Sequence, residues 1–301
     1  MPRRRILIDT DPGVDDAVAI LLALASPELE VLGLVAVAGN LPLDITERNA
    51  RALVELAGRP DIPVFAGCPR PLSRTPITAE HVHGEDGLGG LALPMPAMAL
   101  RPEHGVDFLI QTLRQAAPNS VTLCALGPLT NIAVALVMAP DIAAGIAEIV
   151  LMGGAARLSG NITPAAEFNI HVDPHAAALV FDSGVPITMA PLEVTAELRG
   201  TSECLAAIGR LATRCGGAAA RLIGPKVAMH DPCVIAYLIA PELFQGREAN
   251  VAVETQSPLT IGMTVVDWRG RSGRPANARV LETVDKEGFF RLLAERIARL
   301  P

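Results

Sequence analysis

The chain has 301 residues, of which 50% are hydrophobic and 19% charged, a composition that excludes a disordered protein. Its formal net charge of −7 argues against nucleic acid as a partner. Its apolar stretch Ala17–Ala25 is too short to cross a bilayer, so no membrane partner is expected. Asp9 interrupts the apolar run that a signal peptide would need, and the five cysteines form no Cys-x-x-Cys pair. A cytoplasmic protein is therefore predicted.

Strand-like and helix-like patterns alternate through the first half of the chain. Strands are predicted at Arg5–Ile8, Val31–Gly39, Pro63–Phe65, Val121–Leu126 and Ile146–Met152, and helices at Asp15–Ala25, Ile45–Gly58, Val106–Ala116 and Thr130–Met138. Such alternation indicates βαβ units with right-handed crossovers. The predicted fold class is therefore α/β, with a mostly parallel, Rossmann-like open sheet covered by helices on both faces.

No internal repeat or clear linker interrupts residues 1–301, which favours one domain. The C-terminal part is predicted to be helix-rich over Ser202–Ala240, with a last helix near Glu287–Arg299. Two stretches, residues 67–102 and 214–230, are longer than ordinary connections and contain His and Gly. We expect both to be lid loops.

Polar residues follow the predicted strands at the points where the strands end. Asp9, Asp11, Asp15 and Asp16 come after the first strand, and Asn40 comes after the second. In an open parallel sheet, ligands bind beyond the carboxyl ends of the strands, so an active site is expected at this edge.

The four aspartates of "LIDTDPGVDD" carry more negative charge than a turn or a helix start needs. Asp15 or Asp16 alone would be read as a helix cap. Four carboxylates this close raise the pKa of some of them unless a cation neutralises the group. Oxygen-only ligands select a hard ion, Ca²⁺ or Mg²⁺.

Two further motifs carry polar side chains. Asn161, Glu167 and Asn169 lie in "GNITPAAEFNIHVDP", and an extended backbone would point Glu167 and Asn169 to the same side, as a sugar site requires. A polar loop with an Asx turn is the alternative. In "MHDPC", His230 and Asp231 precede Pro232 at an expected helix start, where Asp231 could be no more than a cap.

Taken together, the motifs "DTDPGVDDA", "AGN", "GPLTNIA", "MGG", "GNITPAAEFNIHVDP" and "HDP" resemble those of the inosine–uridine type nucleoside hydrolases. The resemblance runs in the family's order from about Ile6 to Asn277. It implies hydrolysis of the N-glycosidic bond of a ribonucleoside to ribose and a free nucleobase, with Ca²⁺ as cofactor. It also implies a small-molecule nucleoside substrate and a homodimer or homotetramer.

The resemblance assigns roles residue by residue. Metal ligands would be Asp11, Asp16, the carbonyl of Leu126 and Asp231, with Asp11 also acting as general base toward a metal-bound water. Ribose hydroxyls would be held by Asp15, Asn40, Asn161, Glu167 and Asn169. His83, Met152 and Phe168 would line the substrate pocket, His230 would be the acid for the leaving base, and Asp9 would be a structural carboxylate.

This chain departs from the family pattern where the base should bind. Only 3% of its residues are aromatic, and the stretch before "HDP" has none. Arg221 or Lys226 could replace the missing base contacts. Purine, pyrimidine and broad specificity all stay open, as does a noncanonical N-riboside.

Two other functions are compatible with parts of the pattern. A haloacid dehalogenase-type phosphatase also places Asp-x-Asp after its first strand and binds Mg²⁺, but Asp15 and Asp16 would repel a phosphate. A non-catalytic, Ca²⁺-dependent nucleoside-binding protein is the second alternative, and retention of Asp11 argues against it.

Overall fold

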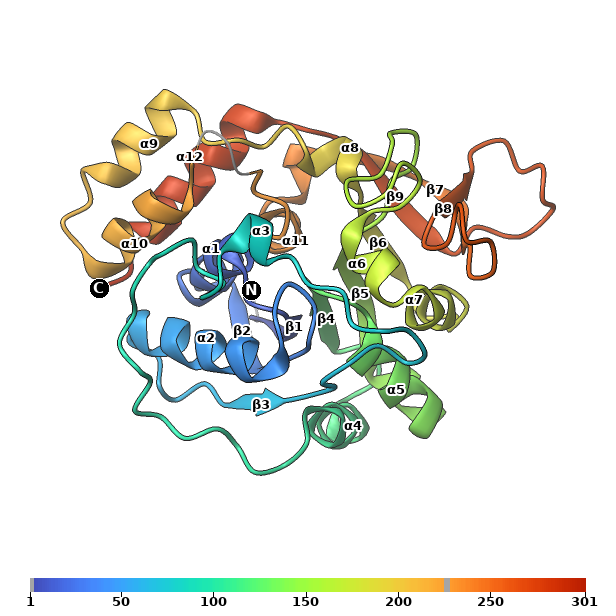
Figure 1. Ribbon diagram of the computed structural model, residues 1–301, viewed down its shortest axis with the longest axis horizontal. Helices are drawn as coiled ribbons and strands as arrows, with labels where there is room; N and C mark the ends of the chain where they lie inside the picture. The colour runs from blue at the N-terminus through green and yellow to red at the C-terminus, as the bar shows by residue number, and fades with distance from the viewer. Residues whose placement is uncertain (1–2, 225–227) are drawn as a thin grey trace.

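The computed structural model describes residues 3–224 and 228–301, built around a nine-stranded sheet (Figure 1). The strands are β1 (Arg4–Thr10), β2 (Leu29–Ala36), β3 (Val64–Ala66), β4 (Val121–Ala125), β5 (Ile146–Met152), β6 (Ile187–Ala190), β7 (Phe244–Val253), β8 (Thr264–Asp267) and β9 (Ala278–Val284). The helices are α1 (Val14–Leu24), α2 (Leu43–Leu56), α3 (Glu80–His83), α4 (Gly105–Gln115), α5 (Thr130–Met138), α6 (Phe168–Val172), α7 (Pro174–Phe181), α8 (Leu192–Thr195), α9 (Ser202–Gly209), α10 (Arg214–Leu222), α11 (Pro232–Ile239) and α12 (Lys286–Ile297), with 3₁₀ helices η1 (Pro140–Gly145) and η2 (Pro241–Leu243).

The strand order is β3-β2-β1-β4-β5-β6-β9-β7-β8. Strands β1 to β6 and β9 pair in parallel, whereas β7 runs antiparallel to β9 and β8 runs antiparallel to β7. The predicted α/β class with a mostly parallel open sheet is confirmed. The antiparallel β7–β8 edge was not predicted.

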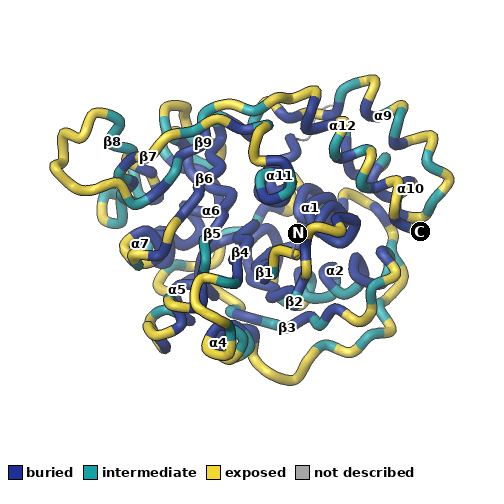
Figure 2. The backbone as a smooth tube through the Cα atoms, turned by 180° about the vertical axis from the view of Figure 1, so that it is seen from behind, coloured by how far each residue is buried: buried dark blue, intermediate teal, exposed yellow. Residues whose placement is uncertain are grey.

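Each buried strand contributes to two hydrophobic cores, because alternate side chains point to opposite faces of a sheet. In β1, Ile6 and Ile8 belong to a core that includes residues of α1, α10, α11 and α12, while Leu7 belongs to a second core with α4, α5 and α7. Helices therefore cover both faces, and the central strands are buried over most of their length, β1 from Ile6 to Thr10 (Figure 2). Strands buried on both faces hold the loops at their carboxyl ends in fixed positions.

The predicted elements of the first half are confirmed to within a few residues at their ends. One lid loop is wrong in part, because Arg214–Leu222 forms α10, which Thr213 caps through a bond from the backbone N–H of Gly216. Residues 225–227 of that loop lie outside the described part of the chain. The stretch 67–102 contains one short helix, α3, and otherwise crosses the surface as a loop.

Across residues 3–224 and 228–301, none of the helices combines the length and the apolar composition that crossing a membrane requires.

Candidate active site

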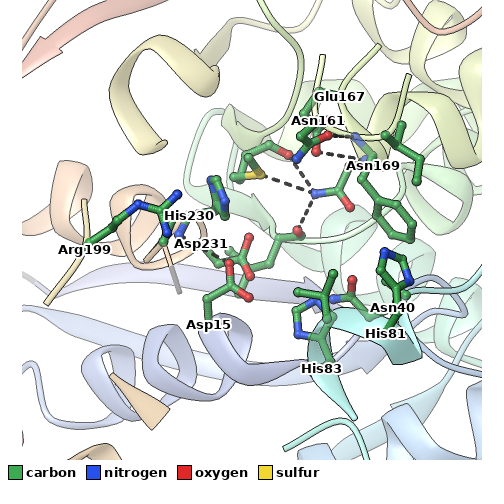
Figure 3. A pocket seen from close by; sticks show the side chains of 17 residues that line it. Asp15, Asn40, His81, His83, Asn161, Glu167, Asn169, Arg199, His230 and Asp231 are labelled. Atoms are coloured by element: carbon green, nitrogen blue, oxygen red, sulfur yellow. Dashed lines mark hydrogen bonds between the residues drawn. The ribbon is translucent and has the colours of Figure 1, made fainter. Parts of the chain in front are cut away.

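A cavity of about 270 Å³ opens at the carboxyl ends of the central strands (Figure 3). Predicted site residues supply much of its lining: Asp15, Asn40, His83, Leu126, Met152, Asn161, Glu167, Phe168, Asn169, His230 and Asp231. Asp11 and Asp16 are fully buried and are not among its lining residues. The topology thus gathers side chains more than two hundred positions apart in the sequence.

Asp16 joins the end of β1 to the start of α1. Its carboxylate accepts hydrogen bonds from the Thr10 hydroxyl at 2.6 Å, the Gly13 backbone N–H at 3.0 Å and the Asn40 side-chain amide at 3.1 Å. The bond from Gly13 is the predicted helix cap. Asp16 therefore serves the helix start and also belongs to the acidic cluster, so the two interpretations are not exclusive.

The Asp11 carboxylate lies against the backbone of Gly39 and Gly127, where any larger residue would collide with it. Its Oδ2 accepts the backbone N–H of Asn40 at 2.6 Å, and its Oδ1 is buried and has no hydrogen-bond partner among residues 3–224 and 228–301. A Cβ atom at Gly39 would lie 2.1 Å from Oδ2, and one at Gly127 would lie 2.3 Å from Oδ1. A buried carboxylate oxygen without a partner is costly, so a ligand for it is expected.

Carboxylates from opposite ends of the chain meet beside Asp11. One oxygen each of Asp15, Asp16 and Asp231 lie within 4.8 Å of one another. Burial raises the pKa of Asp11 and of Asp231 well above the usual range, and repulsion from neighbouring aspartates raises both further. The Asp231 side chain makes no cap hydrogen bond to α11, so capping does not explain it. Oxygen ligands with unrelieved negative charge fit a hard metal ion.

Asp9 lies outside this cluster. Its Oδ2 accepts the Asn131 side-chain amide at 2.8 Å, and burial raises its pKa to about 7. Asn131 also accepts the backbone N–H of Cys68 through its own Oδ1 at 2.7 Å, which ties the start of the long loop to the sheet. Asp9 Oδ1 also lacks a hydrogen-bond partner among the described residues, so what sets Asp11 apart is its proximity to the charges of Asp15 and Asp16.

Glu167 is the N-cap of α6, and its carboxylate accepts the backbone N–H groups of Asn169 at 3.0 Å and Gly154 at 2.9 Å. Burial raises the pKa of Glu167 to about 7. The prediction that this segment is extended is wrong, because Phe168–Val172 is helical. The two side chains nonetheless reach the same cavity, since the cap residue and the first turn of α6 face it together.

Two asparagines hold backbone groups beside the cavity. The Asn169 amide donates to the carbonyl oxygens of Leu126 at 2.8 Å and Met152 at 3.2 Å, which leaves its own carbonyl oxygen to accept. Asn161 accepts the backbone N–H of Phe168 at 2.9 Å through Oδ1, so its amide remains as a donor. Both side chains are thereby oriented before any ligand arrives.

His83, at the end of α3, and His230, just before α11, both line the cavity (Figure 3). The Val14 backbone N–H donates to His83 Nδ1 at 3.0 Å, so in the neutral ring the proton lies on Nε2. His230 donates its backbone N–H to Asp15 at 3.3 Å, and its Nδ1 lies 2.7 Å from the Thr195 hydroxyl. Burial and the charge of Arg199 lower the pKa of His230, although Asp15 opposes this.

Some lining residues were not predicted from the sequence. Arg199 and His81 line the cavity, and Thr195 contacts His230 from α8. Arg221, suggested as a base contact, instead donates to the Gly90 carbonyl at 3.2 Å and is not among the lining residues. Lys226, the other suggestion, lies outside the described residues. No local motif marks Arg199, because it reaches the cavity only through the fold.

Comparison of the chain with known protein families shows where it belongs. The model of the inosine-uridine preferring nucleoside hydrolase family matches residues 6–291. The chain belongs to this family. It is accordingly a hydrolase that acts on the N-glycosyl bonds of ribonucleosides, and this sets aside both the phosphatase and the non-catalytic binding protein.

Individual relatives align with this chain over nearly the whole length of both proteins. A pyrimidine-specific ribonucleoside hydrolase RihA from Shewanella sp. (strain ANA-3) is 46% identical and aligns with 98% of this chain and 96% of its own. The structure of a plant nucleoside hydrolase, PpNRh1, superposes with a TM-score of 0.92 at 33% identity, covering 99% of both chains. A purine-preferring ribonucleoside hydrolase from Gardnerella vaginalis gives a TM-score of 0.90 at 31% identity over 98% of both chains.

Proposed function

We propose that the chain is a Ca²⁺-dependent ribonucleoside hydrolase whose metal is held by Asp11, Asp15, Asp16 and Asp231. The observation that carries this proposal is the buried cluster of carboxylates at the cavity, where Asp11 Oδ1 meets no hydrogen-bond partner in the described part of the chain. We include Asp15 among the ligands because one of its oxygens lies within 4.8 Å of oxygens of Asp16 and Asp231. Leu126, whose carbonyl the sequence suggested as a ligand, lines the same cavity. All of these donors are oxygen atoms, the set that Ca²⁺ prefers.

The ribose is proposed to bind where donors and acceptors converge. Asp15, Asn40, Asn161, Glu167 and Asn169 supply carboxylate and amide groups to one cavity, and the backbone bonds of Glu167, Asn161 and Asn169 fix their orientation. Cleavage of the glycosidic bond leaves positive charge on the sugar, and the nearby carboxylates stabilise that charge. When bound, Ca²⁺ would orient the ribose hydroxyls and make a coordinated water more acidic.

Proton transfer is assigned to Asp11 and His230. The free Oδ1 of Asp11 takes the proton of the attacking water, whose oxygen joins the anomeric carbon. The bonding electrons pass to the nucleobase, which receives a proton from His230. To act as this acid, the His230 ring must carry a proton on both nitrogens. Its Nδ1–H then donates to the Thr195 hydroxyl and its Nε2–H is left for the base, so Thr195 acts as a positioning residue. His83, Met152 and Phe168 complete the pocket walls.

A reducing-sugar assay tests this function with uridine, cytidine, inosine, adenosine and guanosine, each with and without a chelator. Both base classes are included because a pyrimidine-specific relative and a purine-preferring structure align with the whole chain. We expect sugar release that a chelator abolishes and that added Ca²⁺ restores. Sugar release unaffected by a chelator, or none from any nucleoside in the presence of Ca²⁺, would contradict the proposal.

A variant assay tests the role of Asp11 separately. Replacing Asp11 by Ala is expected to slow hydrolysis of nitrophenyl riboside by roughly 10²- to 10⁴-fold, the usual contribution of a general base. Asp9→Asn is the matched control, because Asp9 is an equally buried aspartate that contacts Asn131 instead. Equal rates for Asp11→Ala and wild type would refute the assignment.

Assembly as a homodimer or homotetramer and a cytoplasmic location stay predictions. Val137 and Met138 on α5 and Leu179 on the contacting α7 are exposed apolar side chains, which supports burial of this surface between copies of the chain. Light scattering on the purified protein measures the oligomeric state.

A further inference from the structure

Arg199 brings a positive charge into a cavity otherwise rich in carboxylates. It follows α8 and its backbone forms a bridge with Ala228, just ahead of His230. Figure 3 shows its side chain on the same side of the cavity as His230, across from Asn161, Glu167 and Asn169. Its positive charge also contributes to the lowered pKa of His230, after burial of the ring.

The chemistry of a guanidinium group restricts what it can recognise. It offers up to five N–H donors in a fixed plane and no acceptor. The carboxylates and amides on the other side of the cavity already serve the ribose in the proposed function. A donor-only cation beside the proposed leaving-group acid is therefore best matched to the nucleobase.

Nucleobases differ in whether they present a carbonyl oxygen to such a group. Uracil and hypoxanthine carry ring carbonyl oxygens, whereas adenine carries an amino group and no carbonyl. When the glycosidic bond breaks, its electron pair moves to the base nitrogen, and negative charge spreads onto any conjugated carbonyl oxygen. A guanidinium group beside that oxygen stabilises the leaving base more in the transition state than in the ground state.

We propose that Arg199 is a specificity-determining residue that favours nucleosides whose base carries a carbonyl oxygen. The inference rests on the proposed nucleoside hydrolase function and adds to it the chemical class of the base. It predicts that inosine is hydrolysed faster than adenosine, two purine nucleosides that differ at a single ring position. Uridine, with two carbonyls, belongs to the favoured group.

The test compares the ratio of kcat/KM for inosine to kcat/KM for adenosine in wild type and Arg199→Met. Arg199 is an exposed residue, so its replacement removes no part of the core. Loss of one charge-assisted hydrogen bond to a solvent-accessible carbonyl is expected to lower this ratio by about tenfold. Arg210→Met is the matched control, because Arg210 is also exposed and is not among the lining residues.

Each outcome has one meaning. A ratio that falls in Arg199→Met and not in Arg210→Met supports the assignment, and partial recovery in Arg199→Lys supports it further. An unchanged ratio in Arg199→Met, with nucleosides still hydrolysed, refutes the role of Arg199 and leaves the proposed function intact. Failure of the wild type to release sugar from any nucleoside or from nitrophenyl riboside in the presence of Ca²⁺ refutes the proposed function itself.

Discussion

Gly127→Ala is expected to disable the site by displacing a carboxylate that the substitution does not itself change. A Cβ at position 127 would lie 2.3 Å from Asp11 Oδ1, 2.8 Å from its Cγ and 3.1 Å from Val37 Cγ1. Contacting carbon and oxygen atoms lie about 3.3–3.6 Å apart, so the carboxylate must move by about 1 Å. A misplacement of that size costs on the order of 10²-fold in rate. Overpacking adds about 1–3 kcal/mol of destabilisation.

The assay measures kcat/KM with nitrophenyl riboside, together with a thermal melt that shows the variant is folded. Gly217→Ala is the matched control, because a Cβ there meets nothing within 4 Å and lies within α10. Its activity is expected to equal that of the wild type, with a gain of about 0.5–1 kcal/mol in stability. A folded Gly127→Ala variant with the kcat/KM of the wild type would refute the claim that Asp11 must occupy this position.

Three further predictions concern the metal, the acid and Glu167. At pH 8 a chelator is expected to lower the melting temperature by about 4 °C. This is the stabilisation that a ligand at about 100 times its Kd gives to a chain of this length. An unchanged melting temperature would contradict a bound cation. Thr195→Val should lower kcat/KM for inosine about five- to tenfold and change it less for nitrophenyl riboside, whose leaving group does not need a proton from His230; equal losses with both would indicate a purely structural role. Since burial raises the pKa of Glu167 from 4.5 to about 7, its contribution to the free energy of unfolding is fully present below pH 4.5 and is lost as the pH rises through 7. The difference between wild type and Glu167→Gln should therefore change by about 3 kcal/mol over this range in denaturant titrations, and parallel pH profiles would contradict the shift.

The sequence predicted the first half of the fold well because its strands are buried on both faces. The segment Val31–Gly39, for example, appears as a continuous apolar run between helical patterns. The antiparallel β7 was missed because the polar run Gln245–Glu248 interrupts both the apolar pattern and the regular alternation that mark a strand. The glycine pair at 216–217 made α10 look like a loop, although Thr213 and buried alanines hold it as a helix.

The candidate site was predictable where residues follow strand ends, as Asp11 and Asn40 do. It was less predictable where contacts depend on how distant segments meet. Thr195 reaches His230, and Arg199 reaches the cavity, through the packing of α8 against the carboxyl edge of the sheet. Neither position has a local signal, because a lone Thr or Arg outside a recognisable motif predicts no particular contact.

Calorimetric titration of the chelator-treated protein with Ca²⁺ tests the central claim most directly. The account predicts one site per chain in the wild type and in Asp9→Asn, whose altered side chain contacts Asn131. In Asp231→Asn, which removes one carboxylate of the cluster, binding should weaken by at least 10-fold, as expected for loss of a charged ligand. Absence of Ca²⁺ binding in the wild type, or equal affinity in Asp231→Asn, would contradict the proposed calcium site.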